Sequence, residues 1–569
     1  MSRIRIVDIK NFRAIKDLRF IPTPGINCFI GPGDSGKSSI IDAIDLCLGA
    51  RRTAQFCDTD FHKLNVDQPI EICLTLGELD DSLKNIDHYG QYLRGYDKTS
   101  GELKDEPESG LETVLTLKLE VGSDLEPAWL LYSERAAAQG LVRGIQWADR
   151  VKLAPTRIGA LAQHNLGWQR GSVLNRISDE RADASATLAK AAREARAAFG
   201  DKAATQLGDA LKVVGVTAKE LGIPIGDNVK ALLDAHSVSF VGGTISLHDA
   251  GGVPLRGLGV GSTRLLIAGL QRKAADKSSI ILVDELEHGL EPHRIIRLLG
   301  SLGARDSSNP LQVFATTHSP VALREINGDQ LIVVRRTDTA ITVSYAGTTD
   351  AIQGTIRTSP EAFLAGSVLV CEGASEVGIV RGIDQYRCMN GEVSIFASGV
   401  GLVDAGGEKN IYSRAPAFTA LGYRCAVLRD DDVQVAEAAE NTFTAAGGSV
   451  FKWKPGQALE QAIFEAVSEA SVRQLVALAV EYLDEVIVNA HIRQASQNKF
   501  ELSSCSGDIS TELRECLGRA SKFKASWFKS IAKMEHIGRE IIGPDIGNCS
   551  PEFREEILKI FSWASHVQP

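Results

Sequence analysis

The sequence lacks the features that would mark a membrane-spanning, secreted or zinc-ribbon protein. No run of about eighteen apolar residues occurs among its 569 residues, which argues against a membrane-spanning helix. The N-terminal segment carries charges throughout and has no continuous apolar stretch, so it does not predict a secretory signal. The ten cysteines are scattered without a CxxC pair, which argues against a zinc ribbon or a disulfide framework and favours a reducing cytoplasm.

Positive charge is in short supply. The chain has 62 Lys and Arg against 72 Asp and Glu, a net charge of −10. Such a protein does not coat nucleic acid by bulk electrostatics, so any contact with nucleic acid needs local basic patches and divalent metal to offset the carboxylates. The composition, 44% hydrophobic and 24% charged, is that of a globular protein. At roughly 150 residues per domain, the length predicts about three to four domains.

A glycine-rich segment with complete P-loop spacing follows the apolar run 26–30. It reads Gly31-x-x-x-x-Gly36-Lys37-Ser38, and apolar residues recur after it at helical spacing. Between a strand and a helix, the backbone amides of such a loop converge on phosphates, its lysine reaches the β- and γ-phosphates, and its serine binds Mg²⁺. The predicted nucleotide-binding residues here are Gly31, Gly33, Asp34, Ser35, Gly36, Lys37, Ser38 and Ser39.

A second apolar run, 280–283, ends in the acidic pair Asp284 and Glu285, which is the Walker B arrangement. Its buried strand would place Asp284 against the Mg²⁺ shell, and Glu285 could polarise the attacking water. Just before it, residues 258–264 form a Gly/Ser-rich turn that opens a helix and includes Ser262, a device suited to anion binding. The alternative is an ordinary strand that ends in a solvated acidic pair.

Together these segments resemble the ABC-type ATPase head of SMC and RecF-like proteins. Residues 258–264 resemble its signature loop, 287–293 the segment that faces a dimer partner, and 313–320 the strand that ends in the switch histidine, His318. The resemblance implies that the nucleotide is ATP and that Glu285 and His318 take part in its hydrolysis. It also implies that Ser262 closes on the nucleotide of a second copy, and hence a homodimer or higher homo-oligomer.

A second acidic site follows a new pattern that starts near residue 366. Apolar runs at 367–371, 393–397, 424–428 and 449–453 alternate with segments of helical length, which predicts a parallel α/β sheet. Glu372 ends the first run and Glu376 opens the next helix, while Asp430 and Asp432 follow a later run and point to one side. Clustered carboxylates repel, and a bound divalent ion resolves that conflict; oxygen-only ligands favour Mg²⁺ or Mn²⁺.

This acidic pattern resembles the Toprim fold of topoisomerases, primases and some nucleases. An ABC head followed directly by Toprim is the arrangement of the OLD (overcoming lysogenization defect) nucleases. By resemblance, two metal ions would be held by Glu372, Glu376, Asp430, Asp432 and Glu460. A lysine would stabilise the scissile phosphate, for which we predict Lys524, with Lys522, Lys529 and Lys533 as alternatives.

The predicted fold class is α/β with three parts. An ABC-type P-loop ATPase covers 1–365 with a helical insertion at about 176–236, a possible dimerisation arm; a Rossmann-like Toprim core covers 366–470; C-terminal helices cover 471–569. The predicted function is an ATP-regulated, metal-dependent DNA endonuclease that nicks or cuts both strands. The resemblance also implies bacterial antiviral defence and a possible accessory helicase or retron reverse transcriptase with its DNA. No membrane partner is expected.

Two other functions compete with this prediction. The first is an ATP-gated DNA clamp of the SMC or RecF type without cleavage activity. The second is a topoisomerase or primase. It is disfavoured because Tyr386, Tyr412 and Tyr423 lie inside the Toprim region, where no separate DNA-gripping domain surrounds them, and because no zinc motif is present.

Overall fold

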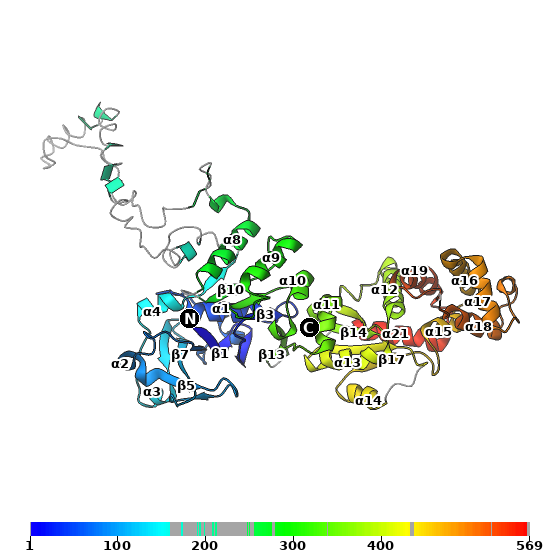
Figure 1. The fold of residues 1–569 in the computed structure, drawn as a ribbon, viewed down its shortest axis with the longest axis horizontal. Coiled ribbons are helices and arrows are strands. Elements are labelled where there is room, and N and C mark those ends of the chain that lie inside the picture. The colour runs from blue at the N-terminus through cyan, green and yellow to red at the C-terminus, as the bar shows by residue number, and fades with distance from the viewer. Residues whose placement is uncertain are drawn as a thin grey trace. The chain divides into compact units, whose positions relative to one another are not determined.

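The computed structural model describes residues 2–159 and 255–565, except 276–278, 338–339, 433–436 and 525, and only isolated short stretches between 160 and 254. The chain divides into two compact units, Met1–Asn27 with Ser38–Thr316, and Cys28–Lys37 with Thr317–Pro569 (Figure 1). The insertion predicted at 176–236 lies, apart from a few positions, outside the described residues. No helix in the described part of the chain is long and apolar enough to cross a membrane.

An antiparallel sheet makes up much of the first unit. The strand order is β2-β1-β4-β7-β5-β6, and β8 also pairs with β7. Buried and partly exposed residues alternate along the first half of β4, so one face of that strand supplies core residues. The strands are β1 (Arg3–Phe12), β2 (Ile15–Phe20), β4 (Ile70–Gly77), β5 (Leu93–Tyr96), β6 (Leu103–Lys104), β7 (Glu112–Val121) and β8 (Pro127–Tyr132).

The first unit also contains three parallel strands, with β10 between β9 and β11. All four residues of β10 and all five of β11 are buried, as expected for a parallel sheet covered on both faces. These strands are β9 (Thr156–Ile158), β10 (Ile280–Val283) and β11 (Gln312–Thr316), and the unit's helices are α1 (Lys37–Leu48, from Ser38 on), α2 (Ile86–Tyr89), α3 (Glu134–Ala138), α4 (Trp147–Leu153), α8 (Val260–Lys273) and α9 (Pro292–Leu302).

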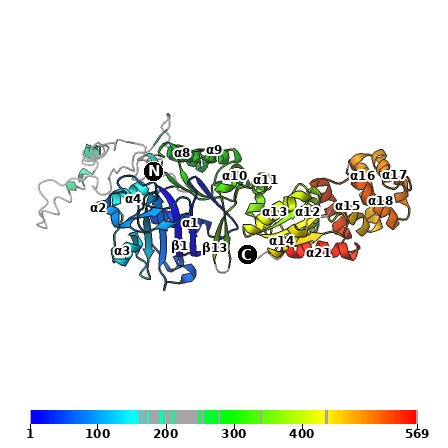
Figure 2. The same cartoon turned by 60° about the horizontal axis from the view of Figure 1, so that its bottom comes forward.

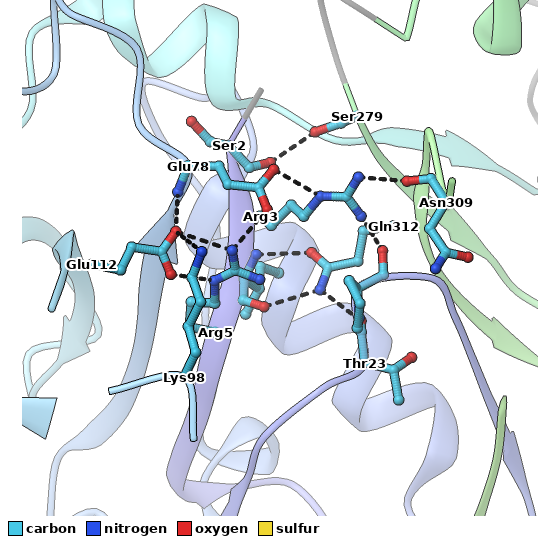
Figure 3. Close-up of polar contacts among 12 residues, drawn as sticks. Ser2, Arg3, Arg5, Thr23, Glu78, Lys98, Glu112, Ser279, Asn309 and Gln312 are labelled. Carbon is cyan, nitrogen blue, oxygen red and sulfur yellow. Dashed lines mark hydrogen bonds and ion pairs between the residues drawn. The ribbon is translucent and has the colours of Figure 1, made fainter. Parts of the chain in front are cut away.

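A buried glutamine joins β1 to the start of β11 (Figure 3). The Gln312 side-chain oxygen accepts from the Ile4 N–H at 2.8 Å, and its amide nitrogen donates to the Ile4 carbonyl at 2.9 Å and to the Thr23 carbonyl at 3.0 Å. Arg3 donates to the Asn309 carbonyl beside it. Because unpaired buried backbone groups are costly, these contacts hold the antiparallel sheet to the parallel strands.

The second unit begins with the strand that carries the P-loop. From Cys28 on, β3 (Ile26–Ile30) pairs in parallel with β12 (Leu331–Arg336), which pairs in antiparallel fashion with β13 (Ile341–Tyr345). The short helices α10 (Pro320–Glu325) and α11 (Asp350–Thr358) lead from this part toward the Toprim region.

A four-stranded, fully parallel sheet forms the core of the Toprim region, in the order β15-β14-β16-β17. The strands are β14 (Ser367–Cys371), β15 (Val400–Asp404), β16 (Arg424–Arg429) and β17 (Ser449–Lys452). The strand predicted at 393–397 is wrong. That run forms turns, because the buried Asp384 carboxylate binds the Ile395 N–H at 2.9 Å and the Ser394 hydroxyl at 2.6 Å.

Helices surround and extend this parallel sheet. In both views α16, α17 and α18 gather together in the C-terminal part (Figure 1 and Figure 2). The helices are α12 (Ala374–Met389), α13 (Glu408–Ala420), α14 (Glu437–Ala445), α15 (Leu459–Ala466), α16 (Glu469–Leu483), α17 (Glu485–Ala495), α18 (Thr511–Ser521), α19 (Ile531–Ile537), α20 (Gly543–Asp545) and α21 (Pro551–Ser565).

A half-buried arginine, Arg335, connects β12 to the entry of the Toprim sheet. The Arg335 guanidinium donates to the carbonyls of Ala365 at 3.1 Å and Gly366 at 3.3 Å, and lies 3.6 Å from the centroid of the Tyr423 ring. The Tyr423 hydroxyl donates to the Phe363 carbonyl at 2.6 Å. This cluster fixes the segment that precedes β14 against the last residues of β12.

Candidate functional sites

The P-loop has the backbone that a phosphate cradle requires. Gly31, Asp34 and Gly36 have φ of 145°, 57° and 97°, and such turns direct successive backbone N–H groups toward one side. A Cβ at Gly31 would lie 2.2 Å from the Val334 carbonyl oxygen of β12, so only glycine fits. Of the other predicted loop residues, Gly33 is exposed, Ser35 is buried and Ser39 is half-buried.

Lys37 and Ser38 stand where the P-loop enters α1. The buried Lys37 ammonium donates to the carbonyls of Gly31 at 3.0 Å and Pro32 at 2.6 Å, so it lies inside the loop it serves. The Ser38 hydroxyl donates to the Asp284 carboxylate at 3.4 Å. That contact places the predicted Mg²⁺ serine beside the Walker B aspartate, as a shared metal position requires.

The Walker B acids are held by Thr316 and Arg264, through contacts that the sequence motifs did not indicate. The Thr316 hydroxyl donates to Asp284 at 2.7 Å and accepts from the Glu285 N–H at 2.8 Å. Glu285 has a φ of 46°, a left-handed conformation that is strained for a residue with a side chain. The fully buried Arg264 donates to the carbonyls of Asp284 and Glu285 at 3.0 and 2.9 Å, which fixes that conformation.

Arg157 brings a cation to the same aspartate. It lies on β9 beside the Walker B strand, and its guanidinium is 3.7 Å from Asp284. It also pairs with Asp42 at 2.7 Å and Asp45 at 3.2 Å, both on α1. Walker B and the P-loop helix therefore share one ion-pair network, which no local pattern in the sequence indicated.

The remaining predicted ATPase residues lie on separate elements. Ser262, in the first turn of α8, accepts a hydrogen bond from Arg294 at 3.2 Å. His318 follows β11 and is exposed. The predicted role of Ser262 depends on a second copy of the chain, that of His318 on its part in ATP hydrolysis, and both stay predictions.

The predicted nuclease carboxylates meet at the C-terminal edge of the parallel Toprim sheet, where α/β proteins place their sites. Glu372 follows β14, and its carboxylate accepts from the Asp430 N–H at 3.0 Å. The Asp430 carboxylate in turn accepts from the Leu459 N–H at 2.8 Å, beside Glu460 in the first turn of α15. Glu376 is buried in the first turn of α12 and accepts from the Gly373 N–H at 2.9 Å.

The negative charges of these carboxylates repel one another, and burial together with this repulsion raises the pKa values of three of them. Burial and the charges of Glu372 and Glu460 raise the pKa of Asp430 to about 8. Burial and the charge of Asp430 raise the pKa of Glu376 well above its usual value. Burial also raises the pKa of Glu372. The site therefore favours a proton or a cation among its carboxylates.

The donor set fits Mg²⁺ or Mn²⁺, since it consists of carboxylate oxygens alone. Within the described residues, no group of three or more His, Cys, Asp or Glu stands in an arrangement that would hold a metal ion as it is. Several carboxylate oxygens are turned to backbone N–H groups instead, as the hydrogen bonds of Glu372, Glu376 and Asp430 show. Metal binding would thus require these side chains to turn toward one point.

The lysine beside this cluster is Lys522, at the end of α18, and not the predicted Lys524. The Lys522 ammonium donates to the Asp432 carboxylate at 2.6 Å. Lys524 is exposed and forms no hydrogen bond or ion pair with any other residue that the structure describes. Lys533 donates to the Trp527 carbonyl at 3.1 Å, and Lys529 is exposed. Lys522 and Lys524 are two residues apart, so only the three-dimensional path of the loop distinguishes them.

Comparison with solved structures finds SMC head domains at low similarity. One is the SMC head domain with an extended coiled coil of Pyrococcus furiosus, bound to the C-terminal domain of ScpA, with 14% identity, a TM-score of 0.32, and coverage of 60% of this chain and 96% of that chain. Another is the SMC head domain from Thermotoga maritima, with 13% identity, a TM-score of 0.29, and coverage of 60% and 98%. These TM-scores are too low to establish a common overall fold. No curated protein matches the chain.

Two family models match the chain in succession. The family described as "AAA domain, putative AbiEii toxin, Type IV TA system" matches residues 26–324, more than half of the chain. The family described as "Overcoming lysogenization defect protein-like, TOPRIM domain" matches residues 363–432, which include Glu372, Glu376, Asp430 and Asp432. The chain therefore belongs to this AAA-domain ATPase family and continues into an OLD-like TOPRIM domain, which makes it an ATPase and metal-dependent nuclease with the architecture of the OLD family.

Proposed function

We propose that the protein is a DNA endonuclease that uses Mg²⁺ or Mn²⁺ in its Toprim domain and is regulated by its ATPase domain. One observation carries the proposal: Glu372 and Asp430, at the ends of neighbouring parallel strands, share a hydrogen bond beside the buried Glu376 and the start of α15. Their raised pKa values favour a positive charge at this edge of the sheet. An ATPase without cleavage activity has no need for such a costly cluster.

The chain's own residues have distinct tasks in phosphodiester hydrolysis. The metal ions would be held by Glu372, Glu376, Asp430, Asp432 and Glu460. Once bound, divalent ions supply an activated water and neutralise charge on the leaving oxygen. Lys522 now pairs with Asp432; when that carboxylate turns to a cation, the freed ammonium can bind a non-bridging phosphate oxygen. Backbone N–H groups of Asp430 and Leu459 donate to one oxygen of the Glu372 and Asp430 carboxylates, respectively, and these side chains would have to turn from that arrangement to hold a metal ion.

Plasmid cleavage tests this proposal. Wild-type protein should nick or linearise supercoiled DNA in Mg²⁺ or Mn²⁺, measured with and without ATP. Glu372→Ala and Asp430→Ala should abolish cleavage and spare ATP hydrolysis, because the ATPase residues belong to other elements. Lys522→Met should reduce cleavage far more than Lys524→Met, its matched control. If both acid variants still cut at the wild-type rate, the chain is instead an ATP-gated DNA clamp without a Toprim nuclease.

We further propose that the protein works as a homodimer or higher homo-oligomer in bacterial antiviral defence, in the cytoplasm. Ser262 at the start of α8 is the residue expected to contact the nucleotide of a second copy, and an accessory helicase or a retron reverse transcriptase with its DNA is the expected partner. Light scattering with ATP should give at least a dimer mass. Phage plating on cells that express wild type or Glu372→Ala tests the defence role, and equal plating would contradict it.

A further inference from the structure

The acidic loop after β16 contains three aspartates in succession, Asp430, Asp431 and Asp432, and is preceded by a buried arginine. Arg429 is 3% exposed and is the last residue of the strand. Its guanidinium donates to the Asp430 carbonyl at 2.6 Å and to the Asp431 carboxylate at 3.0 Å. The arginine therefore touches the backbone of one aspartate and the side chain of the next.

Glu440 of α14 holds the other side of this guanidinium. Its carboxylate accepts from Arg429 Nε and Nη2 at 3.1 and 2.7 Å, and from the Tyr412 hydroxyl at 2.9 Å. Burial raises the pKa of Glu440, but hydrogen bonds from Arg429 and Tyr412 lower it more, so this carboxyl remains ionised. Lys452 reaches Glu440 at 3.4 Å and Asp431 at 4.0 Å. The positive charges of Arg429 and Lys452 thus neutralise the carboxylates of Glu440 and Asp431, outside the nuclease cluster.

The backbone of Asp431 is tied down as well. Its N–H donates to the Gln457 carbonyl at 3.1 Å, and its carbonyl accepts from the Gly456 N–H at 2.8 Å. The loop 453–458 leads directly into α15 and Glu460, so both carboxylate-bearing loops are joined at this point. A rotation at Asp431 would therefore disturb both sides of the nuclease cluster.

We propose that Arg429 is a positioning residue for the nuclease reaction. It holds the Asp431 carboxylate, while Glu440 holds the other side of its guanidinium, so that of the three aspartates only Asp430 and Asp432 serve the metal site. This inference rests on the proposed nuclease function. Without Arg429, the Asp431 carboxylate would keep, among the described residues, only its longer contact with Lys452, at 4.0 Å, and it could compete for the cation and hold it in an unproductive place, because Mg²⁺ and Mn²⁺ accept any nearby carboxylate oxygen.

If Arg429 has this role, its loss should lower the rate of DNA cleavage without weakening the binding of Mn²⁺. Arg429→Met removes a positive charge and releases Asp431, so the Mn²⁺ concentration for half-saturation should stay the same or fall. The rate constant of plasmid cleavage at saturating Mn²⁺ should fall about 10- to 100-fold, the usual cost of losing a partner behind a metal ligand. Arg429→Met/Asp431→Asn should recover most of that rate, because the competing carboxylate is gone.

Three further variants make the test specific. Asp431→Asn alone should cut DNA within about twofold of wild type, and Arg429→Lys should lie between wild type and Arg429→Met. Arg424→Met is the matched control, because Arg424 starts the same strand at its opposite end and lies over Trp563. Mn²⁺ binding to the DNA-free protein is measured by titration calorimetry, and ATP hydrolysis reports intact folding.

The results separate this inference from the proposed function. Failure of wild type to bind Mn²⁺ or cut DNA overturns both. If wild type cuts but Asp431→Asn abolishes cleavage, Asp431 is a ligand and the positioning role is wrong. If Arg429→Met weakens Mn²⁺ binding in parallel with its loss of rate, or if adding Asp431→Asn restores nothing, Arg429 is only a packing residue. Where Arg429→Met does not fold, Arg429→Lys takes its place: a loss of rate without weaker Mn²⁺ binding supports the positioning role, and a parallel loss of both overturns it.

Discussion

Replacing Asp430 by asparagine should make the metal-free protein more stable while it destroys the nuclease. Asparagine keeps an oxygen that can accept from the Leu459 N–H, now at 2.8 Å from Asp430. It removes the negative charge that faces Glu372 and Glu460. The variant therefore separates the electrostatic cost of this carboxylate from its contribution to packing.

The size of the effect follows from the titration of Asp430. Burial and neighbouring charges raise its pKa to about 8, against about 3.9 in an unfolded chain, and each pKa unit is worth about 1.4 kcal/mol. Because the folded pKa is the higher one, the protonated side chain stabilises the fold in full below about pH 4, and this stabilisation is lost as pH rises through about 8. Relative to an uncharged side chain, Asp430 thus costs roughly 5 kcal/mol at about pH 8.5, where it is ionised in the fold, and roughly 1 to 2 kcal/mol at about pH 5, where folding requires it to bind a proton. Solvent screening reduces the gain we expect for Asp430→Asn to about 2 to 4 kcal/mol at the higher pH.

Urea unfolding in EDTA at these two pH values, followed by tryptophan fluorescence, measures the difference. The exposed Asp508, replaced by asparagine, is the control and should change little. Saturating Mn²⁺ should reverse the order, because it stabilises wild type more than the variant by mass action. If Asp430→Asn is no more stable than wild type at about pH 8.5, or gains as much at about pH 5, the carboxylates do not repel as argued.

Two other substitutions test the ATPase loop and the Toprim packing. Lys37→Ala should weaken ATP binding by about tenfold or more, measured by calorimetry, because the Lys37 ammonium lies within the phosphate loop. Stabilisation of the variant by Mn²⁺ should be unchanged. An ATP affinity equal to that of wild type would disprove the P-loop assignment. Gly382→Ala should destabilise the protein by about 1 to 3 kcal/mol, because its Cβ would lie 2.2 Å from the Glu535 carbonyl oxygen. The control Gly354→Ala, in α11 with open space around it, should be neutral or stabilising in thermal unfolding, and equal melting temperatures for both variants would contradict the close approach of α12 and α19.

Contiguous motifs could be predicted from the sequence because their chemistry lies within a few residues. The Gly31–Ser38 loop and the pair Asp284 and Glu285 stand at the ends of buried strands, where the apolar runs placed them. Glu372 and Asp430 follow neighbouring strands in the same way. The family matches confirm the predicted order of ATPase and Toprim domains.

Contacts between distant segments could not be read in this way. Thr316 and Arg264 reach the Walker B acids across about 20 to 30 residues of sequence. Both lie in segments that resemble those of an ABC-type head, 313–320 and 258–264, but nothing in those segments indicated these contacts. Lys522 differs from Lys524 only in where the turn after α18 points. The apolar run 393–397 is more hydrophobic than 400–404, yet the buried carboxylate of Asp384 turns the first run away from the sheet.

Two consecutive residues of β12 contact the phosphate loop of the ATPase and the entry of the nuclease sheet. The Val334 carbonyl closes on Gly31 of the phosphate loop, and the next side chain, Arg335, holds Gly366 and Tyr423 at the entry of the nuclease sheet. Val334 and Arg335 are consecutive residues, with Cα atoms about 3.8 Å apart. Along β12, therefore, the phosphate loop is connected to the entry of the nuclease sheet through a strand and not through a flexible linker. A displacement of β12 that accompanies phosphate binding would strain the Arg335 contacts directly. By reciprocity, a ligand that favours one setting of those contacts would change the affinity for nucleotide by the same factor.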